Sequence, residues 1–214
     1  MATKPVSLQT LQRLPTYLHY LKSLHKEDYP YISATNLADA LNLNDVQVRK
    51  DLAQISSGGK PKIGYNKANL IFDLEQYLGY NKTDSAVIVG AGNLGKALLT
   101  YSGFAEYGLE IVAAFDKDES LIGTNVHGKQ IFSLDKLPNL CERLNVKIGI
   151  ITVPAPHAQE VCDKMTACGI CAIWNFAPAH LTVPNNVLVQ NENMAASLAI
   201  LTKHLSSKIN SDEE

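Results

Sequence analysis

Residues 85–99 read SAVIVGAGNLGKALL, an apolar run followed by a glycine-rich turn and a helix-forming stretch. The apolar run predicts a buried strand, and the turn carries the spacing G-x-G-x-x-G. A second apolar run, EIVAAFD at 110–116, ends on Asp116, 21 positions after Gly95. This succession of strand, glycine turn, helix, strand and acidic residue is typical of a dinucleotide-binding unit.

Each glycine of the turn has its own expected task. Gly90 permits the tight turn, Gly92 lets the backbone approach a pyrophosphate, and Gly95 lets the helix pack closely on the strand. The helix N-terminus offers free N–H groups and a partial positive charge to phosphates. Asp116 would accept hydrogen bonds from the adenosine ribose and so favours NAD(H), although adjacent Lys117 tempers that preference. The expected cofactor-binding residues of this unit are Gly90, Ala91, Gly92, Asn93, Leu94, Gly95, Asp116 and Lys117.

The alternation of strand and helix continues beyond the second strand. It predicts a Rossmann-like doubly wound parallel sheet, with the cofactor at the carboxyl ends of the strands. Val153-Pro154 and Asn175-Phe176 end two of the later strands, so we expect both pairs to border the same crevice. The expected strands are 86–90, 110–116, 147–153, 171–176 and 187–190, and the expected helices are 93–102, 134–144 and 156–168.

The eighty residues before the glycine turn predict a separate helical domain. Leucines recur at three- and four-residue spacing behind Pro15, which suits the first turn of a helix. Ser33 can cap a short helix at 34–41, and a three-residue turn leads into another helix that ends near Ile55. Two short helices joined in this way form a helix-turn-helix, and residues 56–65 then predict a small hairpin, or wing.

The second helix of this pair is expected to present polar and basic side chains to solvent. Its apolar face is formed by Val48, Leu52 and Ile55, and its exposed side by Gln47, Arg49, Lys50, Asp51 and Gln54. Residues 1–80 carry nine Lys/Arg against seven Asp/Glu, whereas residues 81–214 carry ten against fourteen. A small basic face on an acidic protein is compatible with nucleic-acid contact, although a charge run is more often a solvated surface. The candidate DNA-binding residues are Gln47, Arg49, Lys50, Gln54, Lys60 and Lys62.

A last helix is expected from Asn193 to about Ile209. It carries an apolar stripe of Met194, Leu198, Leu201, Leu205 and Ile209. No further strand follows for this helix to cover, so two interpretations stay open: it packs on its own domain, or it packs on a partner chain. The expected domains are therefore 1–80, 81–192 and 193–214.

Composition limits the class of protein. Hydrophobic residues make up 46% of the chain and charged residues 19%, as in ordinary globular proteins. No apolar run is long enough to span a membrane, and the first five residues lack the apolar core of a secretory signal. Four cysteines without a disulfide framework fit a reducing compartment. We therefore expect a cytoplasmic protein without a membrane partner.

A winged helix-turn-helix followed by a short Rossmann-like domain and one terminal helix is a rare combination. Its distinguishing runs are RLP at 13–15, VRKDL at 48–52, GY at 64–65, GAGNLG at 90–95, FD at 115–116 and WNFAP at 174–178. Together they resemble the Rex family, bacterial repressors that sense the NADH/NAD⁺ ratio. The resemblance covers nearly the whole chain, and VRKDL upstream of the glycine turn is its most specific part.

The resemblance implies a homodimer with one cofactor per subunit and terminal helices exchanged between subunits. The winged domains of this dimer would bind a palindromic operator in double-stranded DNA. NADH would close the dimer, move the two recognition helices and release the DNA, while NAD⁺ would compete without driving release. A dimer reads two half-sites at fixed spacing, so rotation between subunits prevents simultaneous docking.

The chain departs from the family pattern in two places. After VRKDL the family usually continues Ser-Tyr-Phe-Gly with a Lys-Arg-Gly wing, whereas this chain has AQIS at 53–56 and KPK at 60–62, a stiffer tip. An aspartate near the start of the terminal helix, which pairs with a tyrosine or an arginine in alternate states, corresponds to Asn193. The matching partners would be Tyr101 and Arg13. Asparagine can hydrogen-bond a tyrosine but forms no charge pair with an arginine, which bears on the strength of the redox switch.

Other candidate sites have simpler explanations. Cys168 and Cys171 form a C-x-x-C at an expected helix C-terminus, with Cys171 entering a buried strand, whereas reactive pairs lie at helix N-termini. A zinc site would need two more ligands, and only Cys162 is nearby in sequence. His157 and His180 lie near the expected crevice, but we interpret them as a helix-start and a loop residue.

The chief alternative function is an enzyme, either a small dehydrogenase or a CoA-binding protein of the succinyl-CoA synthetase type. Residues 81–192 leave no room for a substrate domain, and no Ser-x-x-x-Tyr-x-x-x-Lys run is present. A third interpretation, a cofactor-stabilised dimer of structural role, leaves the basic helix unexplained. We therefore expect no catalytic residues and no metal site.

Overall fold

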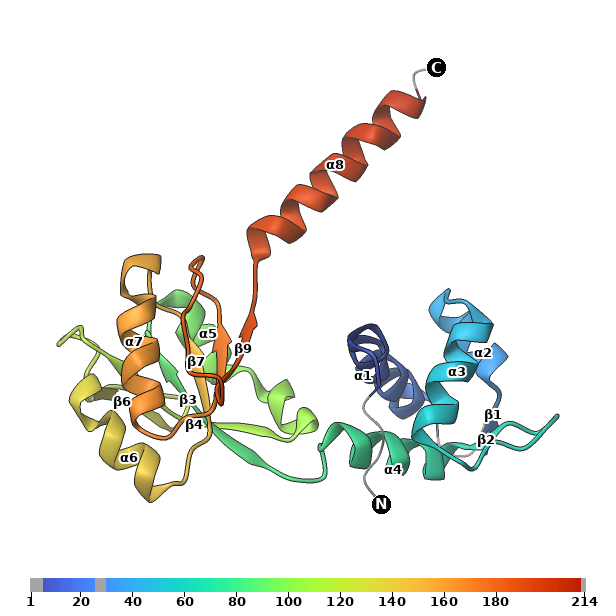
Figure 1. Cartoon of the computed structure of the whole chain (residues 1–214), viewed down its shortest axis with the longest axis horizontal. Coiled ribbons are helices and arrows are strands. Elements are labelled where there is room, and N and C mark those ends of the chain that lie inside the picture. The colour runs from blue at the N-terminus through green and yellow to red at the C-terminus, as the bar shows by residue number, and fades with distance from the viewer. Residues whose placement is uncertain (1–5, 26–29, 213–214) are drawn as a thin grey trace. The chain divides into compact units, whose positions relative to one another are not determined.

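The chain folds as two compact units that meet in sequence between Lys82 and Thr83. The computed structural model describes residues 6–25 and 30–212, with side chains as far as Ile209 (Figure 1). Each described unit has its own hydrophobic core: one in the N-terminal unit, and one on either face of the sheet in the second unit.

Four helices and a two-stranded sheet make up the described part of the N-terminal unit. Each helix begins with a side-chain cap from Ser7, Ser33, Asn44 or Asn66, which satisfies an otherwise unpaired backbone N–H. The elements are α1 (Leu8–Ser23), β1 (Tyr31–Ile32), α2 (Ala34–Leu41), α3 (Asp45–Ile55), β2 (Tyr65–Asn66) and α4 (Lys67–Leu78).

The sequence placed Pro15 in the first turn of a helix, and this was wrong. Ser7 caps α1 a full two turns earlier, so Pro15 lies in the helix interior. Proline cannot donate to the carbonyl four residues before it, yet the helix continues through that position. Burial of Leu14, Tyr17 and Leu18 around the proline holds the helix together despite the missing bond.

The wing is shorter than the hairpin expected over residues 56–65. Lys60 and Gly64 exchange backbone hydrogen bonds of 2.9 Å across a tight turn. The chain then enters β2, which pairs antiparallel with β1 rather than with residues 56–59. The wing therefore extends from a small sheet anchored beside α2.

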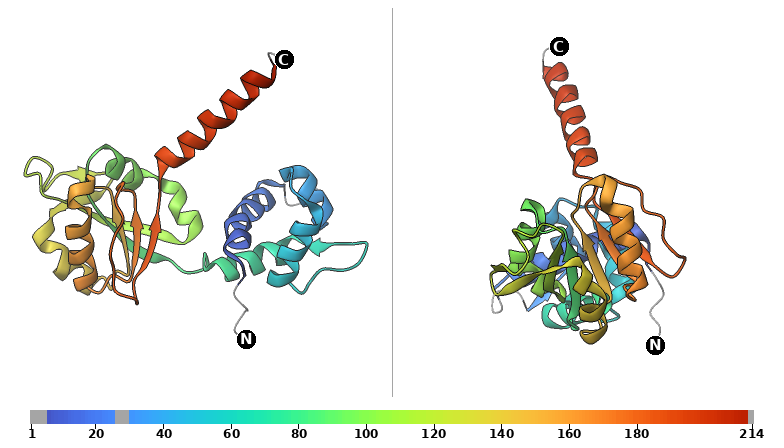
Figure 2. Two further views of the ribbon diagram at one scale, coloured as in Figure 1. Left: turned by 45° about the horizontal axis from the view of Figure 1, so that its top comes forward. Right: turned by 90° about the vertical axis from the view of Figure 1, so that its left-hand side faces the viewer.

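The second unit is a seven-stranded sheet with helices on both faces (Figure 2). The strand order is β5-β6-β4-β3-β7-β8-β9, parallel except for the β5–β6 pair. Its elements are β3 (Asp84–Val89), α5 (Asn93–Thr100), η1 (Ser102–Tyr107), β4 (Leu109–Asp116), β5 (Asn125–Val126), β6 (Lys129–Ser133), η2 (Leu134–Lys136), α6 (Leu137–Arg143), β7 (Ile148–Ile151), α7 (Ala155–Ala167), β8 (Ala172–Asn175), β9 (Leu188–Asn191) and α8 (Met194–Asp212).

This arrangement confirms the doubly wound parallel sheet, but β5 and β6 were missed by sequence reasoning. The two strands form a hairpin around His127 and Gly128, which have φ values of +48° and +82°. Such paired positive φ values suit the turn of a two-residue hairpin. Only Ile131 is fully buried in β6, so the segment lacked the apolar run by which the other strands were found.

Alternate residues of β3 face the two cores, as expected for a sheet covered on both sides. Val87 and Val89 pack toward α6 and α7, whereas Ala86 and Ile88 pack in the core that includes Leu99 of α5. Because β3, β4 and β7 are parallel neighbours, their carboxyl ends meet at one edge of the sheet, where the glycine turn begins.

The terminal helix α8 follows β9 and has no buried side chain from Met194 to Ile209. The interpretation in which it packs on its own domain is therefore wrong for this part of the chain. In the described residues we find no helix with the length and apolarity that a membrane crossing requires.

Candidate functional site

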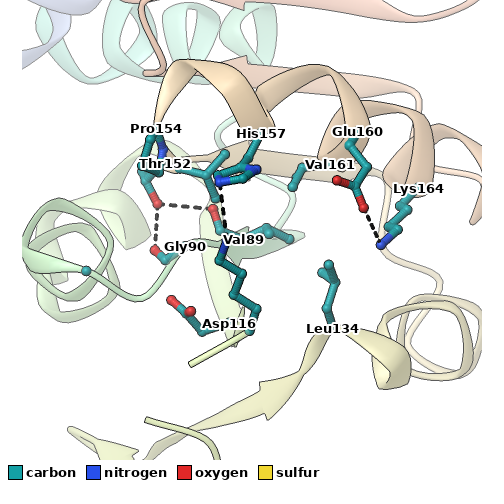
Figure 3. A pocket seen from close by; sticks show the side chains of 13 residues that line it. Val89, Gly90, Asp116, Leu134, Thr152, Pro154, His157, Glu160, Val161 and Lys164 are labelled. Carbon is teal, nitrogen blue, oxygen red and sulfur yellow. Dashed lines mark hydrogen bonds and ion pairs between the residues drawn. The ribbon is translucent and has the colours of Figure 1, made fainter. Parts of the chain in front are cut away.

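A cleft of about 350 Å³ lies at the carboxyl ends of β3, β4 and β7. Figure 3 shows Asp116 on one side of the cleft and Pro154 and His157 at the start of α7 on the other. Of the predicted cofactor residues, this lining brings together Gly90, Gly92, Asp116, Lys117, Val153 and Pro154. Sequence reasoning did not assign the remaining lining residues to the cofactor: Val89, Leu134, Thr152, His157, Glu160, Val161 and Lys164.

The glycine turn is shaped by close backbone approaches. Gly90 has a φ of +103°, and a Cβ there would lie 2.9 Å from the backbone of Thr152. A Cβ on Gly95 would collide with the carbonyl oxygen of Gly90, so the helix can approach the strand only with glycine at this position. A Cβ on Gly92, by contrast, would meet no atom within 4 Å, which leaves the backbone open toward the cleft. Thr152 fixes the turn by donating its hydroxyl to the carbonyl of Gly90 at 2.6 Å.

The helix behind this turn has no side-chain cap. The N-cap of α5 is Gly92, whereas a serine or asparagine oxygen caps each helix of the N-terminal unit. The N-terminus of α5, which includes Asn93, Leu94 and Gly95, therefore offers backbone N–H groups at the cleft without a competing side chain. This is the arrangement that binds phosphate groups.

Asp116 is half-buried at the end of β4, with part of its hydrogen-bonding capacity in use. One carboxylate oxygen accepts the backbone N–H of Ala91 at 2.6 Å, and the other accepts that of Asp118 at 3.0 Å. These bonds link the end of β4 to the glycine turn and fix the carboxylate in place. A carboxylate has about four acceptor positions, so Asp116 can still accept ribose hydroxyls.

Exposed polar side chains line the outer part of the cleft. Lys117 Nζ lies 3.2 Å from His157 Nε2, and Lys164 pairs with Glu160 at 2.9 Å (Figure 3). The pair on α7 is a solvent-exposed i,i+4 contact of small energetic value. His157 is placed at the start of a helix, as expected, and its side chain lines the cleft beside Lys117.

Asn175 and Phe176 do not line this cleft, although sequence reasoning placed them at its border. Asn175 is fully buried, and its amide donates to the carbonyls of Ala177 and Ala179 and to Asn191. Phe176 packs against Trp174 with ring centroids 4.9 Å apart. Their observed contacts stabilise the end of β8.

The six candidate DNA-binding residues are all exposed on α3 or the wing. Arg49, Lys60 and Lys62 line one groove together with Ser33 and Thr35 at the start of α2. Gln47, Lys50 and Gln54 lie on α3 outside that groove. Within the described residues, Lys50, Lys60 and Lys62 form no ion pair, so three positive charges are available on this surface.

Asp51, expected on the exposed side of α3, is instead fully buried. The guanidinium of Arg13 on α1 holds its carboxylate with contacts of 2.8 and 3.0 Å. Burial alone would raise the pKa of Asp51, but hydrogen bonds from Arg13, Gln47, Tyr17 and Thr10 outweigh it and lower that pKa. Burial and the neighbouring carboxylate raise the pKa of Tyr17 to about 12. The helical periodicity missed this because the paired charge lies on α1, far away in sequence.

The three candidate switch residues each have local partners in their own unit. Arg13 is engaged by Asp51, Tyr101 stacks edge-on against Phe104, and Asn193 caps α8 by accepting the N–H of Ala196 at 2.9 Å. The side chain of Tyr101 remains exposed.

The C-x-x-C pair lies at the C-terminal end of α7, where the helix dipole does not favour a thiolate. Cys168 ends α7, as predicted, but Cys171 is exposed rather than buried, because β8 begins one residue later. Burial raises the pKa of the Cys168 thiol, which opposes thiolate formation. Among the described residues we find no group of three His, Cys, Asp or Glu side chains placed to hold a metal ion.

Two family descriptions match the two units separately. Residues 5–53 match a putative DNA-binding protein N-terminus, and residues 81–179 match a CoA-binding domain. The second match reflects the Rossmann-like sheet that such domains share.

Relatives match over nearly the whole chain. The redox-sensing transcriptional repressor Rex of Treponema denticola is 42% identical over 199 residues, which cover 93% of this chain and 95% of the relative. The protein of the same name from Porphyromonas gingivalis is 40% identical over 198 residues, 92% of this chain and 91% of its own.

Solved structures agree with these relatives. RSP in complex with β-NAD⁺ and operator DNA matches with a TM-score of 0.90 and 32% identity, over 98% of this chain and 97% of RSP. RSP in complex with β-NADH matches with a TM-score of 0.86 and 32% identity, over 97% of this chain and 98% of RSP. A third structure of RSP, a Rex-family repressor, matches with a TM-score of 0.87 and 31% identity, over 98% of this chain and 98% of RSP.

Proposed function

This chain belongs to the Rex family of redox-sensing transcriptional repressors, and we propose that it binds palindromic operator DNA as a homodimer and releases it when NADH occupies the cleft. The observation that carries the proposal is the presence, in one chain, of an exposed basic helix with a wing and a cleft at an uncapped helix N-terminus. The protein is a regulator rather than an enzyme. We place its action in the cytoplasm, where NADH and DNA are both present.

The residues of the cleft fit a nicotinamide dinucleotide. The open backbone at Gly92 and the start of α5 would hold the pyrophosphate, and Asp116 would accept the adenosine ribose hydroxyls. Val153 and Pro154 would close the other side. The bound cofactor supplies a redox signal, because its reduced and oxidised rings differ in charge.

The exposed stripe of α8 supports the dimer. Met194, Leu198, Leu201, Leu205 and Ile209 all lie in water in the isolated chain, and a partner would bury them. Replacement of Leu201 and Leu205 by glutamate is expected to yield a monomer by light scattering. Wild-type protein that remains monomeric at micromolar concentration would contradict the dimer.

A dimer couples the cleft to DNA by geometry. A change in angle between subunits separates two recognition helices that must enter grooves a fixed number of turns apart. A coupling of about 1–3 kcal/mol between ligands is typical, and DNA must weaken NADH binding by the same factor. Arg13, Tyr101 and Asn193 are our candidates for residues that change partners in this transition.

Gel shifts with nucleotide titrations test the function. The probe is a duplex that the full-length protein selects from a random-sequence pool in the absence of nucleotide. NADH is expected to release the probe at concentrations where NAD⁺ does not. Failure to select any sequence at physiological salt would overturn the repressor proposal, and a shift unaffected by NADH would overturn the redox response.

A matched pair of lysine variants tests the DNA-binding surface. Lys50→Ala on α3 is expected to weaken DNA binding by about 1–3 kcal/mol if Lys50 contacts a base, with no change in NADH affinity without DNA. Lys147→Ala, which removes an exposed lysine of the second unit, is the control and should leave DNA binding unchanged. Equal losses in both variants would mean that net charge, rather than α3, governs the affinity.

A further inference from the structure

A buried carboxylate lies directly beneath the exposed face of α3. Asp51 has no solvent-accessible surface, yet it lies on the same helix as the candidate DNA-binding residues. Three of its donors, Thr10, Arg13 and Tyr17, come from successive turns of α1. The fourth donor is Gln47, one helical turn before Asp51 and exposed on α3.

The five hydrogen bonds to Asp51 divide between its two oxygens. Oδ2 accepts Arg13 Nε at 2.8 Å and the Tyr17 hydroxyl at 2.9 Å. Oδ1 accepts the Thr10 hydroxyl and Arg13 Nη2, both at 3.0 Å, and Gln47 Nε2 at 2.9 Å. A bidentate guanidinium and two hydroxyls hold the carboxylate from the side of α1. The position of the carboxylate is therefore fixed independently of Gln47.

This arrangement determines how the amide of Gln47 is oriented. An ionised carboxylate only accepts hydrogen bonds, so the amide must turn its nitrogen toward Asp51 and cannot flip. Among the described residues the Gln47 Oε1 atom accepts no hydrogen bond, and Nε2 retains one N–H beside the one given to Asp51. An exposed glutamine without such a partner would rotate freely and offer either group in either direction.

We propose that Asp51 is a positioning residue for DNA recognition, which fixes the Gln47 amide so that α3 presents one defined acceptor and one defined donor to a base edge. The base that complements this pair is adenine, whose major-groove edge offers the N6 donor beside the N7 acceptor. The inference rests on the proposed function, since it requires α3 to lie in the major groove. It assigns to the buried part of VRKDL a role in sequence discrimination.

Base-pair discrimination by variants of the full-length protein tests this role. The probes are the duplex selected by the wild type and a panel with each base pair replaced, and affinities are measured by fluorescence anisotropy at one salt concentration. Gln47→Ala is expected to abolish discrimination at one A·T pair per half-site. Asp51→Asn places an amide nitrogen among donors and is expected to lower discrimination at that same pair about tenfold. The double variant should show no further loss there.

Tyr17→Phe is the matched control. It removes a donor from Oδ2 and leaves the contact between Gln47 and Oδ1, so discrimination should remain as in the wild type. A uniform loss of affinity for every duplex in Asp51→Asn would overturn the proposal and indicate a structural role only. Loss of discrimination at a pair that Gln47→Ala leaves intact would overturn it as well.

A measurement on the wild type covers the case in which Asp51→Asn does not fold. Side-chain ¹⁵N relaxation should show the Gln47 amide to be rigid, while the exposed Gln12 on α1 averages freely. Equal mobility of the two amides would overturn the proposal.

If the wild type selects no sequence, the proposed function itself fails. If it selects one and Gln47→Ala discriminates as well as the wild type, only the positioning role fails.

Discussion

Asp51 and Asp116 lie at the two candidate recognition surfaces, and their carboxylates differ in burial and in hydrogen-bond partners. Asp51 is fully buried, with side-chain donors from α1 and α3 on both oxygens. Asp116 is half-buried at the mouth of a cleft, and its described bonds come from two backbone N–H groups. The first carboxylate completes its hydrogen bonding inside the protein, whereas the second keeps capacity for a ligand.

The difference teaches how to separate a structural carboxylate from a ligand-binding one. Removing a buried group leaves its donors unpaired, so the cost falls on the stability of the fold. Removing a group that faces a cleft leaves the fold nearly intact, so the cost falls on ligand binding. The residue type and the nearby charges do not distinguish the two aspartates. The burial of their side chains and the donors that bond them do.

The largest expected effect is on the stability of the N-terminal unit. Asp51→Ala should lower its free energy of unfolding by about 3 kcal/mol, because the buried hydroxyls of Thr10 and Tyr17 lose their acceptor. Urea unfolding followed by circular dichroism measures the loss, while fluorescence of Trp174, the one tryptophan of the chain, follows the second unit. An unchanged circular dichroism midpoint would contradict the comparison.

Asp116→Ala should weaken ligand binding and leave the stability of the fold nearly unchanged. NADH affinity should fall by about 10- to 100-fold, since hydrogen bonds to an ionised acceptor are worth about 1.5–3 kcal/mol. Binding of DNA without nucleotide should be unchanged. Titration calorimetry with NADH and anisotropy with the selected duplex measure the two. Equal loss of both activities would mean that Asp116, like Asp51, maintains the fold.

Lowering the pH should change the free energy of unfolding through Asp51, by less than the Asp51→Ala substitution does. The pKa of Asp51 is lower in the folded state than its ordinary value, so folding gains stability from its ionised form. That contribution is complete above the ordinary aspartate pKa and is lost as the pH falls through it toward the lower folded value. Unfolding free energies of the wild type and Asp51→Asn, measured between pH 7 and pH 3, should converge in acid. A gap that stays constant would contradict this assignment.

The smallest effect on the free energy of unfolding is expected for Asp45, a carboxylate on α3 that is neither buried nor in a cleft. Asp45 pairs with Arg49 at 3.1 Å, and both side chains are largely exposed. Asp45→Ala should cost only about 0.5 kcal/mol in urea unfolding, and less at high salt. A cost as large as that of Asp51→Ala would show that burial does not separate the two cases.

Local patterns predicted most of the fold. The cap at Ser33, the glycine turn and the apolar runs of β3, β4 and β7 each depend on neighbours in sequence, and each was confirmed. The misplaced start of α1 has a different cause. Packing around Pro15 outweighs the lost hydrogen bond, and packing involves residues that no local window contains.

The candidate site was predictable to the same extent. Glycine spacing and Asp116 located the cleft, because parallel strands bring their carboxyl ends to one edge. Thr152 carried no signal in sequence, because it lay inside the expected strand 147–153 and its hydroxyl bonds the carbonyl of Gly90, 62 positions earlier. The distances from Asn175 to its partners show that a strand end can face the fold interior instead of the cleft.

The sequence by itself determined that the chain has a helix-turn-helix unit and a dinucleotide-type sheet, because caps, glycine geometry and apolar periodicity act over a few residues. It also located the cleft residues Gly90, Gly92 and Asp116 and the exposed basic side chains of α3. Only the tertiary structure decided the state of Asp51. Four of the five hydrogen bonds to its carboxylate depend on α1 packing against α3, and they join residues 34 to 41 positions apart.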